Sequence, residues 1–201
     1  MSAAPVHITG TGLVSAAGYD AAASCAAVRC KIANVTETAF IVAGEPLFAA
    51  QISLPDDLRG HRKVHTLLGC AAAEALAEAG TADGPLLALV AVADAQRPGV
   101  LLPDDAELLA TLAADLGVAL DPRSRVLRLG RWAGAAAVDE ARRELANGHP
   151  RVLVAAYDSL LTGATVNHLA ATGRLITRDQ PDGFIPGEAA AALVLSATPA
   201  P

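Results

Sequence analysis

Three cysteines carry the most nucleophilic side chains of this sequence. Cys25 and Cys30 lie five residues apart in an alanine-rich stretch, and Cys70 lies in a second alanine-rich stretch. A reactive cysteine needs a helix N-terminus, a base or a nearby cation that favours the thiolate. All three cysteines fall inside helical patterns, so we interpret them as small buried hydrophobic residues. No CxxC motif or Cys/His spacing predicts a metal site.

Three other groups of residues carry weaker chemical signals. Residues 10–15 follow a short apolar run, as in a dinucleotide-binding turn, but Ser15 stands where that motif has its third glycine. His61 and His65 are spaced to share one helix face and lack a third metal ligand, so we expect an exposed polar face. The pair Asp158-Ser159 lacks the flanking glycines of a nucleophile elbow. The sequence therefore predicts neither a cofactor nor a metal.

Four arginines form the most uneven charge distribution in the chain. They are Arg123, Arg125, Arg128 and Arg131, and no acidic residue lies between them. The segment ends where a helix is expected to begin. Because a helix N-terminus and arginines together can hold an anion, Arg125, Arg128 and Arg131 form a candidate anion site. The alternative, which the sequence favours, is that these are polar positions on an edge strand, where charge discourages unwanted pairing.

The composition sets limits on the class of protein. The 201 residues are 53% hydrophobic and 18% charged, which is enough for a sizeable core and argues against disorder. The net charge of −6 is not the basic footprint of a nucleic-acid-binding protein. The longest apolar run, residues 85–93, is too short to span a bilayer, and no signal peptide is visible. We expect a cytoplasmic protein with no nucleic-acid or membrane partner.

Short apolar runs alternate with helical patterns along the chain. Strands are expected at residues 6–9, 86–92, 125–129, 151–156 and 189–195, with a tight turn at residues 10–12. Helices are expected at residues 20–31, from Asp56 or Asp57 to Gly80, and at residues 104–116 and 133–147. Residues 39–52 are expected to form a hairpin or two short extended segments. This order predicts one α/β domain over residues 1–201.

Three segments together carry a resemblance to β-ketoacyl synthases. VHITGTGLVSAAG, residues 6–18, resembles their first strand and turn, and DGFIPGEAAAALVL, residues 182–195, resembles their Gly-Glu turn and the strand after it. RVLVAAYDS, residues 151–159, takes the place of the strand that ends near a Gly-Gly-x-[Asp/Glu]-Ser motif. The resemblance implies the N-terminal half of a thiolase-like fold. That half is a three-layer α/β/α domain with a mixed, mostly parallel five-stranded sheet, in which residues 189–195 run antiparallel.

The departures from the family pattern concern catalysis. The resemblance implies a nucleophilic cysteine at the start of the helix over residues 133–147, and Arg131 stands at that position, followed by Trp132. Arginine stays protonated near neutral pH and cannot attack a thioester. The family's catalytic histidines lie in its C-terminal half, which this sequence does not include. In the full fold, the same helix is sandwiched between two half-domains.

The resemblance also suggests a cellular role. Residues 23–40 are similar to a divergent ketosynthase-like group, some of whose members are encoded beside type VI secretion effector genes. We expect a non-catalytic pseudoenzyme, an accessory or adaptor whose partner is an acyl carrier protein or a secretion effector. The alternatives are an acyltransferase that needs a second half or a partner subunit, and an anion or nucleotide binder. We also expect a homodimer through residues 133–138 or 125–129, burying on the order of 1,000 Å² or more.

Overall fold

The structure is a computed structural model that describes residues 5–55, 57–80 and 84–199. The strands are β1 (His7–Ser15), β2 (Thr36–Val42), β3 (Glu45–Ala49), β4 (Leu87–Val92), β5 (Arg125–Leu127), β6 (Arg151–Ser159) and β7 (Glu188–Ser196). The helices are α1 (Ala21–Arg29), α2 (Gly60–Ala79), α3 (Asp105–Leu116), the 3-10 turn η1 (Gly130–Trp132), α4 (Ala133–Ala146) and α5 (Gly163–Ala171).

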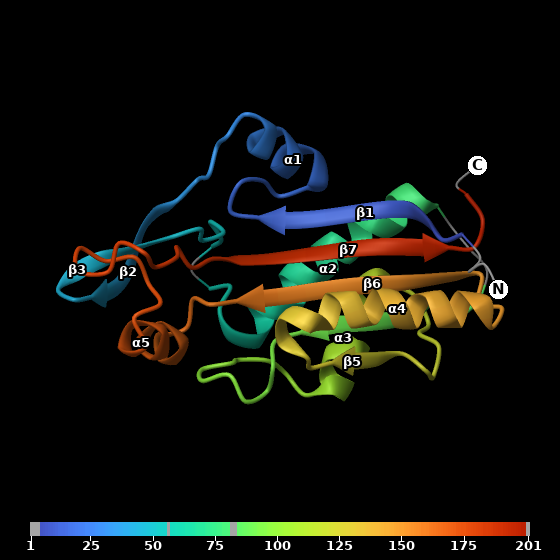
Figure 1. The fold of residues 1–201 in the computed structure, drawn as a ribbon. Helices are drawn as coiled ribbons and strands as arrows, with labels where there is room; N and C mark the ends of the chain where they lie inside the picture. The colour runs from blue at the N-terminus through green and yellow to red at the C-terminus, as the bar shows by residue number, and fades with distance from the viewer. Residues whose placement is uncertain (1–4, 56, 81–83, 200–201) are drawn as a thin grey trace.

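Five strands form one mixed sheet in the order β1-β7-β6-β4-β5 (Figure 1). β4 pairs in parallel with both β5 and β6, whereas β7 runs antiparallel to its neighbours β1 and β6. Four strands therefore point one way and β7 alone points the other way. This confirms the expected mixed, mostly parallel sheet and the antiparallel direction of residues 189–195.

Helices cover both faces of the sheet, which gives the expected three layers. All six residues of β4 are buried, as required for a strand with helices on both sides. α2 and α3 pack on one face, where their aliphatic side chains form the largest core cluster. α4 lies on the other face (Figure 1) and buries a stripe with helical spacing. The stripe consists of Ala133, Ala137, Ala141 and Leu145.

The turn expected at residues 10–12 is wrong, because β1 continues through it to Ser15. A Cβ atom on Gly10 would lie 1.9 Å from the Ala75 carbonyl oxygen, and one on Gly12 would lie 1.9 Å from the Ala71 carbonyl oxygen. The two glycines thus allow the backbones of β1 and α2 to touch. They belong to a strand and do not open a loop for phosphate.

Glutamates of α2 complete the hydrogen bonding of β1 at the edge of the sheet. Glu74 accepts a hydrogen bond from the Leu13 N–H at 2.9 Å, and Glu78 accepts one from the Thr11 N–H at 2.7 Å. Thr11 donates to Glu78 through its hydroxyl as well, and these two bonds lower the pKa of Glu78 below its ordinary value. Side chains of α2 therefore satisfy backbone donors on the outer edge of β1.

Two helices differ from the sequence prediction. α2 begins at Gly60 instead of Asp57, because a turn closed by the Leu58 N–H to the Pro55 carbonyl precedes it; Asp56 lies outside the described residues. α2 does end before Gly80, as expected. α5 was not predicted, since its threonines, glycine and valine are weak helix formers. The Thr162 side chain caps α5 by accepting a hydrogen bond from the Thr165 N–H.

A smaller unit adjoins the carboxyl end of β6. β2 and β3 form the expected hairpin, a separate two-stranded antiparallel sheet. One of its faces packs on α5 through a third core cluster of Leu47, Val166 and Leu175. No helix within the described ranges is long and apolar enough to cross a membrane.

Candidate functional site

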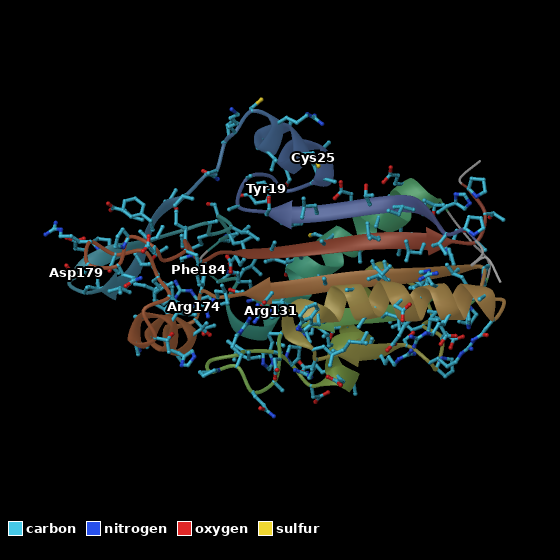
Figure 2. All side chains as sticks on the ribbon, in the orientation of Figure 1. Tyr19, Cys25, Arg131, Arg174, Asp179 and Phe184 are labelled. Atoms are coloured by element: carbon cyan, nitrogen blue, oxygen red, sulfur yellow. The ribbon has the colours of Figure 1, made fainter. Side chains whose placement is uncertain are left out.

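Arg131 lies in η1, directly before α4, where the nucleophile of the family was expected. Its side chain is exposed, and Figure 2 shows it at the N-terminal end of α4. Trp132 follows and is 70% exposed, so it is not part of the core. Gly130 adopts a positive φ of 56°, and a Cβ atom there would come within 3.4 Å of the Asp94 side chain. The turn thus holds an exposed guanidinium and an exposed indole at a helix start.

The three cysteines lie away from this turn. Cys25 is on α1, beyond the β1 edge of the sheet (Figure 2), Cys30 follows the same helix, and Cys70 is on α2. All three are free thiols with exposed side chains. The prediction that they are buried hydrophobic residues is wrong, because Cys25 and Cys70 are not at the buried positions of α1 and α2, and Cys30 lies beyond the end of α1.

The arginines predicted as an anion site contact different carboxylates. Arg125 donates to Glu140 on α4 at 2.5 Å, and Arg128 contacts Asp105 at the start of α3 at 2.7 Å. Arg131 has no ion pair with a described residue in the structure. The three guanidinium groups are therefore not gathered around one point, and the anion site stays a prediction.

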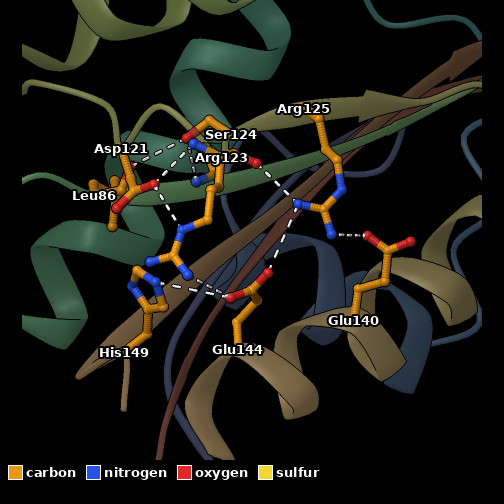
Figure 3. Close-up of polar contacts among 9 residues, drawn as sticks. Leu86, Asp121, Arg123, Ser124, Arg125, Glu140, Glu144 and His149 are labelled. Carbon is orange, nitrogen blue, oxygen red and sulfur yellow. Dashed lines mark hydrogen bonds and ion pairs between the residues drawn. The ribbon is translucent and has the colours of Figure 1, made fainter. Parts of the chain in front are cut away.

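Arg123, in the turn before β5, joins this turn to α4 in a wider network (Figure 3). Its guanidinium contacts Asp121 and Glu144, both at 3.2 Å, and Glu144 also faces the imidazole of His149 at 3.8 Å. The hydrogen bond from the Arg123 backbone N–H lowers the pKa of Asp121 below its ordinary value. Arg123 and Arg125 thus fasten α4 to the edge of the sheet.

A cavity of about 830 Å³ opens at the carboxyl ends of β4 and β6. Crevices at this end of parallel strands are where α/β proteins usually bind ligands. Leu54, Leu101 and Leu161 line it on the apolar side. Its polar lining includes Arg97, whose guanidinium donates two hydrogen bonds to the Asp158 carboxylate, at 2.6 and 2.8 Å.

A buried carboxylate lies below this cavity. The side chain of Glu188 has no exposed surface, and Lys63 donates to one of its oxygens at 2.6 Å. The Ile52 N–H donates to the same oxygen at 3.1 Å, and the Ser159 hydroxyl donates to the other at 2.9 Å. Since every partner is a donor, the charge is fully compensated. These bonds tie β7 to β6, α2 and the segment after β3.

Tyr157 lines the same cavity and is almost fully buried. Burial raises the pKa of its phenol strongly, and the negative charge of Glu188 raises it further. The phenol is therefore neutral over the physiological pH range and can act as a hydrogen-bond donor, not as a base.

Of the two histidines of α2, His61 is partly exposed and His65 is less exposed than expected. The side chain of His65 is only 13% exposed, so the prediction of an exposed face is wrong for this residue. Glu107 of α3 lies 3.5 Å from the His65 Nε2 and 3.8 Å from the His61 Nδ1. Among the described residues, no group of three His, Cys, Asp or Glu side chains has the geometry to hold a metal ion.

Sequence reasoning missed the cavity and the buried carboxylate network next to it. In the sequence, Glu188 stands out only as part of a family turn, and no pattern singles out Lys63 or Arg97. A signal was present: Asp158-Ser159 follows a strand expected to be buried, and the ends of such strands commonly face a ligand crevice. The partners, however, are 61 and 125 residues away along the chain, so no local pattern connects them.

Ketosynthases are among the solved structures that share this fold. A type II polyketide ketosynthase described with its acyl-carrier protein and a hexaketide superposes with a TM-score of 0.75 at 18% identity, over 97% of this chain and 58% of that one. The ketosynthase from module 6 of the bacillaene synthase of Bacillus subtilis 168 gives 0.72 at 17%, over 95% and 40%. The ishigamide ketosynthase/chain length factor gives 0.70 at 18%, over 97% and 59%.

These likenesses are structural. No protein-family model and no curated protein matches the sequence. The chain spans between two fifths and three fifths of the length of these ketosynthases. These superpositions, together with the mixed five-stranded sheet between helices, show that the chain has a ketosynthase-like, thiolase-type α/β fold.

Proposed function

We propose that this chain is a non-catalytic, ketosynthase-like protein that acts through protein contacts. The observation that carries the proposal is Arg131 at the turn before α4, where the resemblance places a nucleophilic cysteine. The positive end of the α4 dipole would stabilise a thiolate there. A guanidinium gains nothing from that position and cannot attack an acyl group.

The outer face of α4 supports the same proposal. In the full ketosynthase fold, this helix is sandwiched between two half-domains. Here its outer face carries Asp139, Arg142 and Arg143, with side chains 49%, 47% and 71% exposed. Both arginines pair with Asp139, and a second sheet laid over α4 would take this exposed charge cluster, with its one carboxylate for two guanidinium groups, out of water at a cost of several kcal/mol. The helix is amphipathic and suited to solvent on that side.

Protein contact requires exposed residues that can anchor a partner. Leu129 and Trp132, 51% and 70% exposed, flank Arg131 in the turn before α4. Tryptophan and arginine are the residue types that most often dominate binding energy at interfaces. We propose that this turn and the neighbouring edge strand β5 form a homodimer interface. The proposed heterologous partner is an acyl carrier protein, with which one of the similar ketosynthases forms a complex, or a secretion effector.

The cavity favours a second candidate function. Its volume of about 830 Å³ and its leucine-rich wall suit an organic ligand of moderate size. The second candidate is therefore an acyltransferase that binds an acyl group here and is completed by another chain. It would need a nucleophile other than the family cysteine.

An acyl-transfer assay separates the two candidates. We expect purified protein to neither hydrolyse an acyl thioester nor condense it with a malonyl thioester, in the presence and absence of acyl carrier protein. Arg131→Cys should be equally inactive, because the variant gains a thiol but no base or oxyanion donors. Turnover that Ser159→Ala or Arg131→Ala abolishes would establish the acyltransferase and refute the proposal.

A further inference from the structure

The long outer edge of the sheet lacks the usual protection against pairing with another strand. The sheet ends on one side at β5, which has three residues, and on the other at β1, which has nine. A long edge strand presents backbone groups that can pair with another chain, and proteins commonly blunt such an edge with charged side chains or proline. Residues 7–15 contain no lysine, arginine, aspartate, glutamate or proline. Protection of this edge therefore has to come from another element.

Two glutamates of α2 occupy the place of a sixth strand. The Thr11 N–H donates to one oxygen of Glu78 at 2.7 Å, and the Thr11 hydroxyl donates to the same oxygen at 2.8 Å. The Leu13 N–H donates to one oxygen of Glu74 at 2.9 Å, and the other oxygen accepts a hydrogen bond from the Ala21 N–H at 2.8 Å. A strand added beside β1 would need the N–H groups of Thr11 and Leu13, and both are already bonded.

The spacing of the two glutamates matches the spacing of the strand. Residues two apart on a strand are separated by about 6.8 Å, and residues four apart on a helix by about 6 Å along its axis. Glu74 and Glu78, one turn apart on α2, can therefore face Leu13 and Thr11 at the same time. The helix lies close enough because Gly12 has no side chain: a Cβ atom there would lie 1.9 Å from a carbonyl oxygen of α2.

The two ends of β1 are closed in other ways. The Ser15 N–H donates to the Gly18 carbonyl at 2.8 Å, and the Gly18 N–H donates back to the Ser15 carbonyl at 3.2 Å. α1 follows this turn and lies beyond the edge (Figure 1). At the other end, the register with β7 shifts between Ile8 and Gly10, and such an irregularity disrupts pairing. The middle of the strand, residues 11–13, is the part that the carboxylates protect.

We propose that Glu74 and Glu78 mask the β1 edge, and that this edge is a latent pairing surface for the β1 edge of a second copy of the chain. A second copy fits because antiparallel pairing of two identical strands about a two-fold axis is self-complementary and uses backbone groups. The same symmetry strengthens the mask, since it would bring four carboxylates, two from each copy, against one another. The surface lies at the opposite edge of the sheet from β5, so it is separate from the homodimer interface proposed there.

The double variant Glu74→Ala/Glu78→Ala tests the mask. It frees both N–H donors and removes the repulsion, so we expect it to self-associate. Its mass in sedimentation equilibrium should rise with concentration to at least twice that of wild type under the same conditions. The matched control is Glu37→Ala/Asp179→Ala, which removes the same charge from two exposed positions away from β1 and should keep the mass of wild type. Circular dichroism verifies that each variant is folded.

A proline distinguishes strand pairing from general aggregation. The Thr11 N–H points away from β7, so Thr11→Pro leaves the hydrogen bonds of the sheet intact and removes a donor that an added strand needs. Introduced into the double variant, Thr11→Pro should restore the mass of wild type. If the double variant does not fold, the single variant Glu78→Ala, at an exposed position, takes its place with the same control and the same proline.

Three results would overturn the inference. An unmasked variant with the mass of wild type would show that the edge is closed without the carboxylates. Equal association of the control would show that net charge, and not the position of the glutamates, prevents association. Association that Thr11→Pro leaves unchanged would place the contact away from the β1 edge.

Discussion

Replacing Lys63 by Met removes the cation that faces a fully buried carboxylate. Glu188 would keep hydrogen bonds from Ile52 and Ser159 but lose the lysine at 2.6 Å. Removing one partner of a buried ion pair costs about 3–5 kcal/mol, because the remaining charge stays out of water. For a domain stable by about 5–15 kcal/mol, this is a fifth or more of the total. We therefore expect Lys63→Met to be among the most destabilising single changes in the chain.

Urea denaturation followed by circular dichroism measures the loss. The matched control is Arg62→Met, one residue earlier on α2, whose ion pair with Asp57 is 68% exposed on both sides and should cost less than about 1 kcal/mol. Adding Glu188→Gln to Lys63→Met removes the buried charge and should recover at least half of the loss. A loss below about 1 kcal/mol for Lys63→Met, or no recovery in the double variant, would refute this account of the network.

Three further predictions follow from the packing and the exposed turn. Gly12→Ala should lower stability by about 1–3 kcal/mol, because its Cβ would overlap the carbonyl of a residue on α2. Gly134→Ala, which has open space around it on α4, should raise stability by up to about 1 kcal/mol, and thermal melting measures both changes. In a Tyr19→Phe background, Tyr157 should show no phenolate absorbance at about 295 nm until the protein unfolds, because the pKa of its phenol is raised in the folded state. The buried neutral phenol therefore contributes its full share of stability below about pH 10, and this share is lost as the pH rises toward the folded pKa. Trp132→Ser should dissociate the proposed homodimer, which light scattering would show as a halving of mass; a monomeric wild type, or a dimer that the variant leaves intact, would contradict the proposed interface.

The fold was largely predictable because the signals that determine it are local. Asp104 and Gly117 begin and end α3, as their capping preferences predict, and the continuous apolar run of β4 becomes the buried centre of the sheet. The glycines at residues 10–12 misled the prediction because glycine favours a turn and a close approach equally well. Only the partner, α2, decides between the two, and it lies about 60 residues away along the chain.

The candidate site was less predictable for the same physical reason. Arg131 could be placed, because the segment from β5 to α4 is continuous in sequence. The network below the cavity joins Lys63, Ser159 and Glu188 from three separate elements, and only the packed sheet brings them together. The burial of His65 against Glu107 was equally hidden, since it depends on how α2 and α3 cross.

Intact-protein mass spectrometry after incubation with an acyl thioester tests the central proposal most directly. A catalytic ketosynthase-type protein forms a covalent acyl-enzyme at its nucleophile. We predict that wild type shows no acyl adduct at the turn carrying Arg131 or at the cavity residue Ser159, with peptide mapping to separate these positions from the exposed Cys25, Cys30 and Cys70. A stoichiometric adduct at the turn or in the cavity that proceeds to product would contradict the account.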